Sequence, residues 1–366
     1  MIPPHRLRHD LFGLLLLAGI CLSVEGAEYH VPLTTENAII GHYSATKKPV
    51  VTIKSGDTVV MDGGGGSRWG EKDPDTWLKE NNIPVTLATC PALAETHKAL
   101  TEVVRAEGIP SGHLMTGPVY IEGAEPGDSI EVRILSVVTR IPYGTVSGAP
   151  GRGALPADLI ARPFSFVVPI DKARNAGVYT DGVEVPLAPF MGVMGTCPPD
   201  SEGPARKSGP PGLFGGNLDC KELKTGATLF LPVYQKGALF YTGDSHAAQG
   251  DGEVTVSAIE TANTATFQFI LHKGKTLQGP RAETPTHYLT FGLDPDLDKA
   301  MINATLDSID FLKAKQGYDF FRAYALCSIA VDFRVTQVVD GTVGVHGMIP
   351  KKLFVKDADP YWYRSF

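Results

Sequence analysis

The chain has 366 residues, of which 43% are hydrophobic, so it can bury a sizeable core, and its length suggests two domains. Charged residues make up 20% and the formal net charge is -7, a mildly acidic balance that argues against nucleic acid as a partner. The contents of 40 glycines and 28 prolines are high for a helical protein and favour a strand-rich, turn-rich fold.

Residues 1–26 have the pattern of a secretory signal peptide. Arg6 and Arg8 form a basic segment, residues 11–24 are apolar, and Gly26 provides a small residue at a plausible cleavage point. The alternative is a membrane anchor, but the apolar run is shorter than the roughly 20 residues that a spanning helix needs. We therefore expect an exported protein, periplasmic or secreted, with no membrane contact after signal removal.

Residues 27–145 are predicted to form an N-terminal β-sandwich domain. Val50–Met61 is interpreted as two strands around a turn at Gly56-Asp57, and the segment 119–138 as a second hairpin around Gly127-Asp128. The two segments resemble each other loosely, although any hairpin uses such a turn. Between them, residues 91–107 have the apolar spacing of a helix.

Residues 146–290 are predicted to form a central, barrel-like catalytic region. Strands are expected at 228–234, 253–260 and 264–272, because apolar and β-branched residues dominate there. Two stretches rich in glycine and proline, 142–163 and 198–216, are expected to be a boundary or long loops.

Residues 291–366 are predicted to form a C-terminal α+β part. A helix is expected over 294–317, with Asp294 as its cap, Pro295 in its first turn and Gly317 at its end. A second helix over 320–329 and a strand over 333–339 follow. The fold class is therefore mainly β, with β-sandwich or barrel modules and a smaller α+β part at the C-terminus.

Polar residues with the chemistry of a catalytic site are concentrated between Gly215 and Glu253. Three pairs are spaced two apart, so that in an extended segment both members of a pair point to one side. The pairs are Asn217 with Asp219, Asp244 with His246, and Asp251 with Glu253. They can converge if their loops share one end of a sheet.

Two interpretations fit these residues. One is a metal site in which imidazole and carboxylates hold Zn²⁺ or a related ion, with Asp62 and His113 as further ligands and Glu122 or Glu253 as proton shuttle. The other is turn chemistry, because Gly-Asp pairs are common in loops.

Cys220 is followed by Lys221 and Glu222, and these three residue types can form a thiol amidase. A buried structural thiol is the alternative, because neighbours on a strand point to opposite faces. Cys90, Cys197, Cys220 and Cys327 remain after signal removal, and their pairing is open between disulfides and free buried thiols.

Several long blocks resemble the acetamidase/formamidase family. They are HLMTGPVYIEGAEPGDSIEV, PFMGVMGTCP, PGLFGGNLDCKELKTGATLFLPVYQKGALFYTGDSHAAQGDGEV and DFRVTQVVDG with the following GMIPKK. The resemblance runs from about residue 50 to residue 352. It implies a β-rich oligomeric hydrolase that cleaves the C–N bond of short amides to acid and ammonia, in some members with a bound divalent metal, zinc or calcium.

Carried onto this chain, the resemblance and the spacing together give a set of predicted roles. The predicted metal ligands are Asp62, His113, Asp219 and His246, the predicted catalytic acids are Glu122 and Glu253, and the predicted substrate-binding residues are Asn217 and Gln249. The chain has MDGGGG where the family has a longer acidic segment, which leaves the substrate-facing wall open. The expected partner is a small amide, without nucleic acid or membrane and with self-association into a homo-oligomer.

Three alternatives remain beside a metal-assisted amidase. A lactam hydrolase or an amidase with Cys220 as nucleophile would keep the hydrolysis of a C–N bond. A non-catalytic β-sandwich module that binds a ligand would not.

Overall fold

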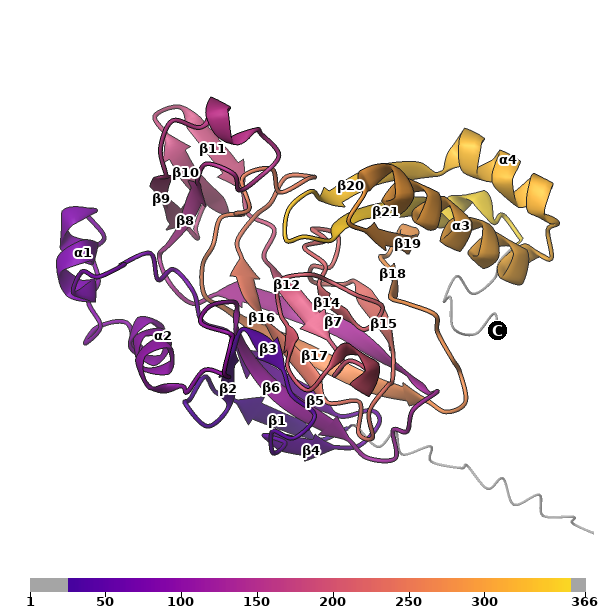
Figure 1. Ribbon diagram of the computed structural model, residues 1–366, viewed down its shortest axis with the longest axis horizontal. Helices are drawn as coiled ribbons and strands as arrows, with labels where there is room; N and C mark the ends of the chain where they lie inside the picture. The colour runs from indigo at the N-terminus through magenta and orange to yellow at the C-terminus, as the bar shows by residue number, and fades with distance from the viewer. Residues whose placement is uncertain (1–25, 357–366) are drawn as a thin grey trace, which may run out of the picture.

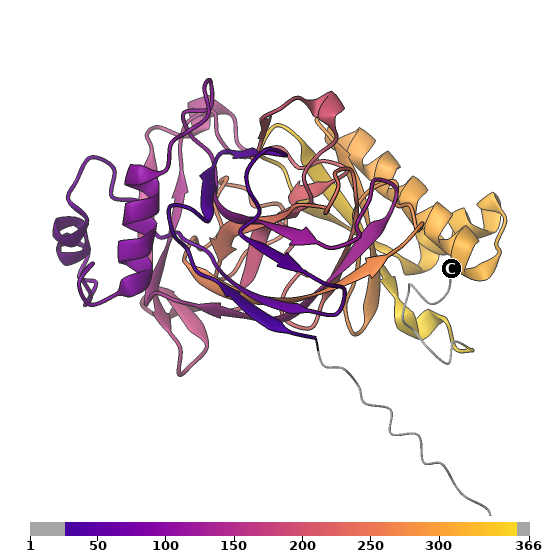
Figure 2. The same cartoon turned by 90° about the horizontal axis from the view of Figure 1, so that it is seen from below.

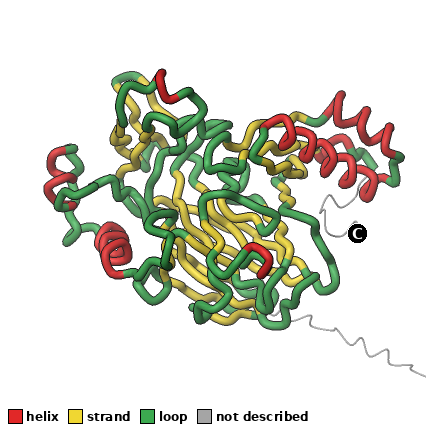
Figure 3. The backbone as a smooth tube through the Cα atoms, in the orientation of Figure 1, coloured by secondary structure: helices red, strands yellow, loops and turns green. Residues whose placement is uncertain are grey.

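The computed structural model describes residues 26–356 and shows a mostly β protein, as predicted. Strands fill its centre and the α-helices lie at its two ends, whereas short one-turn helices also occur between them (Figure 3). Figure 2 shows the helices α1 and α2 at one end and the helices α3 and α4 at the other. The predicted signal segment lies outside the described residues except for Gly26. Within residues 26–356, no helix combines the length and the apolar character that crossing a bilayer requires.

Two large sheets form the centre (Figure 1). The nine-stranded sheet runs, in spatial order, β1 (Glu28–Val31), β5 (Thr58–Asp62), β17 (Asn263–His272), β7 (Ser129–Thr139), β15 (Thr228–Pro232), β18 (Arg281–Glu283), β19 (His287–Asp294), β21 (Val343–Pro350) and β20 (Asp332–Gln337). The six-stranded sheet runs β14 (Gly215–Asn217), β12 (Phe190–Gly195), β16 (Phe240–His246), β6 (Leu114–Ile121) and β2 (Ala38–Ile40), with β4 (Val51–Ile53) also paired to β6.

The main hydrophobic core lies between these sheets. Met191 and Val119 of the six-stranded sheet belong to one buried cluster with Val132 and Phe267 of the nine-stranded sheet. Alternate residues of each strand face this layer, as in a sandwich of two sheets. The nine-stranded sheet takes strands from all three regions that we predicted as domains.

The two predicted hairpins are wrong, because each pair of strands crosses from one sheet to the other. β4 and β6 belong to the six-stranded sheet, whereas β5 and β7 belong to the nine-stranded sheet. At both corners an aspartate accepts a hydrogen bond from the amide three residues earlier: Asp57 from Lys54 at 2.7 Å and Asp128 from Glu125 at 2.8 Å. The loose internal similarity is therefore a repeated corner.

The stretch 142–163, expected to lack regular structure, contains the first strand of a small four-stranded sheet. That sheet consists of β8 (Tyr143–Gly148), β9 (Phe164–Asp171), β10 (Ala176–Thr180) and β11 (Val183–Pro186). The second stretch, 198–216, is mostly loop and includes the short strand β13 (Arg206–Lys207), which pairs with β3 (His42–Tyr43). The strand predicted over 253–260 is absent, and an irregular loop takes its place.

The helices are α1 (Pro74–Glu80), α2 (Pro91–Glu102), α3 (Leu297–Gln316) and α4 (Phe320–Ala330), and the one-turn 3₁₀ helices are Ala157–Leu159, Asp200–Glu202 and Lys351–Leu353. The cap of α3 is Asp296, which accepts from the amides of Asp298 and Lys299, because Asp294 still belongs to β19. Gly317 ends α3 in the left-handed region, as predicted. α3 packs on β19 and β21.

Candidate functional site

The candidate site lies where three strands of the six-stranded sheet and two loops meet. Asp219 follows β14, Asp244 and His246 end β16, and His113 precedes β6. Because β16 and β6 are antiparallel, with Gly243 opposite Met115, the end of β16 lies beside the start of β6. The irregular loop after β16 and the turn between β20 and β21 complete the site with Glu253, Glu260 and Asp340. We call Asp219, Asp244, His246, Glu253, Glu260 and Asp340 the acid cluster.

His246 is the centre of the acid cluster and is completely buried. Its Nε2 lies 3.2 Å from Asp244 Oδ2 and 3.5 Å from Glu260 Oε2, and its Nδ1 lies 4.0 Å from Asp219 Oδ1. Neither ring nitrogen has a well-directed hydrogen bond. Carboxylates therefore lie on both sides of one imidazole.

Two amide side chains brace the carboxylates. Asn217 Nδ2 donates to Asp219 Oδ2 at 2.7 Å and to Asp340 Oδ2 at 2.9 Å. Gln249 Nε2 donates to the backbone carbonyl of Asp219 at 2.6 Å. The amide oxygens of Asn217 and Gln249 are buried and have no protein partner, so two hydrogen-bond acceptors remain available beside the acid cluster.

The backbone at the acid cluster is strained. Asp219, Asp244, Glu253 and Asp340 have φ angles of 47°, 55°, 42° and 52°. This left-handed conformation is uncommon for residues other than glycine, and residues held in such regions cost on the order of 1–3 kcal/mol each. Strain of this kind concentrates at functional sites, where the surrounding fold holds it in place.

Gly192 in β12 leaves the space that two carboxylates occupy. A Cβ at this position would lie 2.4 Å from Asp219 Oδ1, 2.6 Å from Asp244 Oδ2 and 3.0 Å from His246 Cε1. Only glycine therefore lets these three side chains approach one another as they do.

The charges of the acid cluster are strongly coupled. Burial, and then the negative charge of Glu253, raise the pKa of Asp219 well above its usual value. Burial likewise raises the pKa of Glu253 and of Asp340. Burial alone would lower the pKa of His246, but Asp244 and Glu260 outweigh it and raise that pKa. The cluster thus crowds several carboxyl groups around one imidazole, and a bound cation would offset the repulsion between their ionised forms.

The acid cluster fits a divalent metal. Ligand atoms of Asp219, His246 and Glu253 lie within 4.8 Å of one another, and so do those of Asp244, His246 and Glu260. Asp219 Oδ1 and Glu253 Oε2 are buried without a hydrogen-bond partner, as is the imidazole. One imidazole with several carboxylates is a donor set that Zn²⁺ and related ions accept.

The structure brings together most of the predicted site residues. Asn217 and Asp219 contact each other, Asp244 lies beside His246, and Glu253 and Gln249 join them. His113 lies at the edge, with its Nε2 3.8 Å from Asp244 Oδ2. Of the predicted pair Asp251 and Glu253, only Glu253 joins the acid cluster. Asp251 instead forms an ion pair with Lys221 at 2.9 Å.

The structure places two predicted residues elsewhere. Asp62 Oδ2 lies 2.9 Å from His30 Nε2, and its Oδ1 accepts a 2.5 Å hydrogen bond from Thr264. Glu122 is exposed and follows β6 at the end opposite His113, roughly 30 Å away at the rise of an extended strand. Neither carboxylate belongs to the groups that gather around His246.

Sequence reasoning missed Glu260, Asp340 and Gly192. A regular strand over 253–260 would put Glu253 and Glu260 on opposite faces, because an odd number of steps separates them. In the structure Glu253 and Val256 have positive φ angles of 42° and 63°, and the resulting turns bring both carboxylates to His246. Asp340 is followed by Gly341, a turn signal whose partner in space the sequence does not reveal.

Comparison with known proteins decides the family. The model of the acetamidase/formamidase family matches residues 95–202 and 200–356. The chain belongs to the acetamidase/formamidase family. It is a hydrolase that acts on carbon–nitrogen bonds other than peptide bonds in linear amides.

The similarity to individual family members extends over most of their length. A formamidase of Methylophilus methylotrophus is 28% identical over 334 residues, which covers 70% of this chain and 81% of the relative. An acetamidase from Bacillus halodurans, known from a crystal structure, is 30% identical in sequence. Its structure superposes with a TM-score of 0.73, and the match covers 90% of this chain and 100% of the acetamidase. An acetamidase from Yersinia enterocolitica is 27% identical with a TM-score of 0.74, covering 92% and 95%.

Proposed function

We propose that this family member hydrolyses short linear amides, of the size of formamide and acetamide, to a carboxylic acid and ammonia by metal-assisted attack of water. The observation that carries the proposal is the buried imidazole of His246, which lies among carboxylates with both ring nitrogens unsatisfied. The names of the relatives, formamidase and acetamidase, support the substrate class.

Asp219 and His246 would hold the metal, and Asp244 with Glu260 would orient the ring. The Nε2 side of His246 faces Asp244 and Glu260, which can accept its proton, and this leaves the Nδ1 lone pair toward Asp219. When bound, a divalent ion supplies polarisation of the amide carbonyl and lowers the pKa of a water molecule.

Glu253 would move the proton. Its Oε2 is buried, has no hydrogen-bond partner and lies in the same group as Asp219 and His246. Burial favours its neutral form, so the carboxylate can take a proton from the attacking water and give it to the leaving amine. The free oxygens of Asn217 and Gln249 would accept the two N–H groups of a primary amide, which fixes the leaving nitrogen.

A hydrolysis assay with matched variants tests this assignment. We expect Asp219→Asn and His246→Ala to lower ammonia release from formamide and acetamide by at least about a thousandfold. Asp57→Asn is the control, because Asp57 is also buried but accepts hydrogen bonds from the corner amides of Ala27 and Lys54. It should lose stability and keep turnover below its melting temperature. Near-normal rates in both site variants would refute the assignment.

Metal removal tests the cofactor separately. Dialysis against a chelator should abolish turnover and added Zn²⁺ should restore it, with elemental analysis of the same sample. Full activity of a protein shown to be free of metal would exclude metal assistance while leaving amide hydrolysis in place.

Cys220 remains the alternative nucleophile, but its surroundings disfavour it. The thiol is buried, and burial followed by the charge of Glu222 raises its pKa well above the usual value, so little thiolate exists near neutral pH. We expect Cys220→Ser to lose far less activity than Asp219→Asn. Complete loss in this serine variant, with an intact fold, would favour the thiol mechanism.

We also propose export, on the pattern of residues 1–26, which lie outside the described residues apart from Gly26. Cell fractionation, with mass spectrometry of the mature N-terminus, tests it. A cytoplasmic protein that retains residues 1–26 would contradict export. Self-association stays a prediction, and light scattering of the purified protein measures it.

A further inference from the structure

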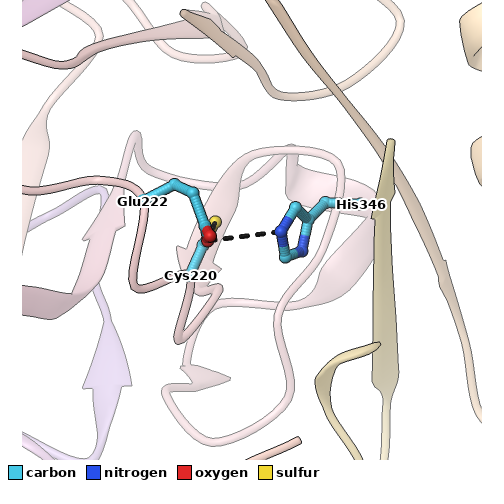
Figure 4. Close-up of side chains that lie close together, drawn as sticks. All are labelled: Cys220, Glu222 and His346. Carbon is cyan, nitrogen blue, oxygen red and sulfur yellow. Dashed lines mark hydrogen bonds and ion pairs between the residues drawn. The ribbon is translucent and has the colours of Figure 1, made fainter. Parts of the chain in front are cut away.

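A second group of potential ligands lies next to the acid cluster. Cys220, Glu222 and His346 are all buried, and one ligand atom from each lies within 4.8 Å of the others. Figure 4 shows that the thiol and the carboxylate come from the segment after β14, whereas the imidazole reaches them from β21. We call these three residues the thiol cluster.

Two separations within the thiol cluster match those around one tetrahedral ion, and the third, between Cys220 Sγ and a ring nitrogen of His346, is at most 4.8 Å. Glu222 Oε2 lies 3.2 Å from His346 Nε2 and 3.5 Å from Cys220 Sγ. Around Zn²⁺, with bonds of about 2.0 Å to oxygen and nitrogen and 2.3 Å to sulfur, tetrahedral ligands lie about 3.3 Å apart for N and O and about 3.5 Å apart for S and O. One carboxylate oxygen is thus near the thiol and the imidazole at the right spacing.

The neighbours of the thiol cluster orient its ligands. Thr336 Oγ1 lies 2.9 Å from His346 Nδ1, which allows Nδ1 to donate its proton and leaves the lone pair of Nε2 toward Glu222. That Nε2 belongs to a completely buried side chain and makes no well-directed hydrogen bond. Arg334 donates to Glu222 Oε1 at 3.0 Å, so it binds the oxygen that faces away from the other two ligands.

A cavity adjoins the thiol cluster at Glu222. Glu222, Arg334 and Met348 line this cavity of about 1340 Å³, whereas Cys220 and His346 are buried behind its wall. Three protein ligands leave one position of a tetrahedral ion for water or another exchangeable group, unlike a closed structural site with four protein ligands.

The geometry points to Cys220, Glu222 and His346 as a second metal site, specific for Zn²⁺-type ions and distinct from the acid cluster. Thiolate and imidazole select borderline and soft ions, whereas Ca²⁺ and Mg²⁺ prefer oxygen ligands. The site would link the segment after β14 to β21, and therefore the six-stranded sheet to the nine-stranded sheet.

Co²⁺ substitution tests this proposal, because only a site with sulfur gives a thiolate-to-cobalt charge-transfer band. The full protein is stripped with a chelator, dialysed and titrated with Co²⁺. The acid cluster contains no sulfur, so we expect the band from the thiol cluster alone, at one Co²⁺ per chain. Absence of the thiolate-to-cobalt band in the native protein would overturn the proposal.

Two kinds of variant locate the site. Cys220→Ser should lose the band, and Cys327→Ser, which removes another buried free thiol, should keep it. A band that persists in Cys220→Ser would overturn the proposal. If circular dichroism shows that Cys220→Ser does not fold, His346→Gln replaces it as the test. This variant keeps the thiol of Cys220 and should bind Co²⁺ at least tenfold more weakly. Unchanged Co²⁺ affinity would overturn the proposal.

Discussion

The acid cluster and the thiol cluster lie on the two sides of one short segment, and they differ in donor chemistry. Asp219 faces His246, whereas the next residue, Cys220, faces Glu222 and His346. Asp219 has a φ angle of 47° and a turn follows at Lys221 and Glu222, so this irregular segment presents adjacent side chains to two different sites. The acid cluster has oxygen donors around one imidazole, while the thiol cluster has one sulfur, one oxygen and one nitrogen.

The two clusters also differ in how the backbone holds them. Asp219, Asp244 and Glu253 sit on left-handed backbone, whereas none of the three residues of the thiol cluster has a positive φ. His346 instead belongs to the regular strand β21. We infer that, of the two clusters, only the acid cluster has backbone strain, where a reaction needs positioned carboxylates, and that the backbone of the thiol cluster is unstrained.

Gly192→Ala is expected to show the largest difference between the two clusters, because it should disturb the acid cluster and leave the thiol cluster intact. The added Cβ would meet Asp219 Oδ1 at 2.4 Å and Asp244 Oδ2 at 2.6 Å, so both carboxylates must move. Because misplacement by about 1 Å can cost about a hundredfold in rate, we expect kcat/KM to fall by at least that factor. The Co²⁺–thiolate band should not change.

Gly209→Ala is the control for this variant, since no heavy atom lies within 4 Å of the Cβ it would gain. It should keep both the hydrolysis rate and the band. If Gly192→Ala retained full activity, the close approach of the two carboxylates would have no role in the reaction.

A smaller effect is expected from Asp340→Asn. Within the acid cluster, Asp340 is linked to Asp219 through Asn217, which donates to both carboxylates, so the substitution removes one charge and loosens that brace. We expect kcat/KM for acetamide to fall about tenfold, in line with the loss of a residue that orients a site through another. The measurement is steady-state ammonia release. A loss as large as that of Asp219→Asn would instead place Asp340 among the residues that touch the substrate.

The sequence predicted the parts of the acid cluster that regular strands carry. Asp244 and His246 are two apart at the end of β16, and their side chains meet as that spacing predicts, although Asp244 itself has a left-handed φ of 55°. Glu260 could not be predicted in this way, since the loop before it has the periodicity of a strand but turns at Glu253 and Val256. Local pattern does not determine such turns, which tertiary contacts impose.

The thiol cluster illustrates a second limit of sequence reasoning. The sequence gives no reason to assign His346 a role, because nothing near it in the chain resembles a ligand. Its partners are more than 120 residues away and meet it only because β21 lies in the nine-stranded sheet beside the segment after β14. The prediction of the two hairpins failed for a related reason: turn residues specify a reversal of direction but not which sheet receives the next strand.

An effect confined to the thiol cluster is expected from Thr336→Val. Valine keeps the volume of the buried threonine but removes the hydroxyl that orients His346 Nδ1 at 2.9 Å. Loss of such a partner lowers metal affinity about 10- to 100-fold, so Co²⁺ titration should show the thiolate band at correspondingly higher concentrations. Thr336→Ser retains the hydroxyl and should titrate like the native protein. Equal Co²⁺ affinity in the two variants would mean that the Thr336 hydroxyl does not orient His346 for metal binding. The ligand separations would then be the remaining argument that the thiol cluster is preorganised.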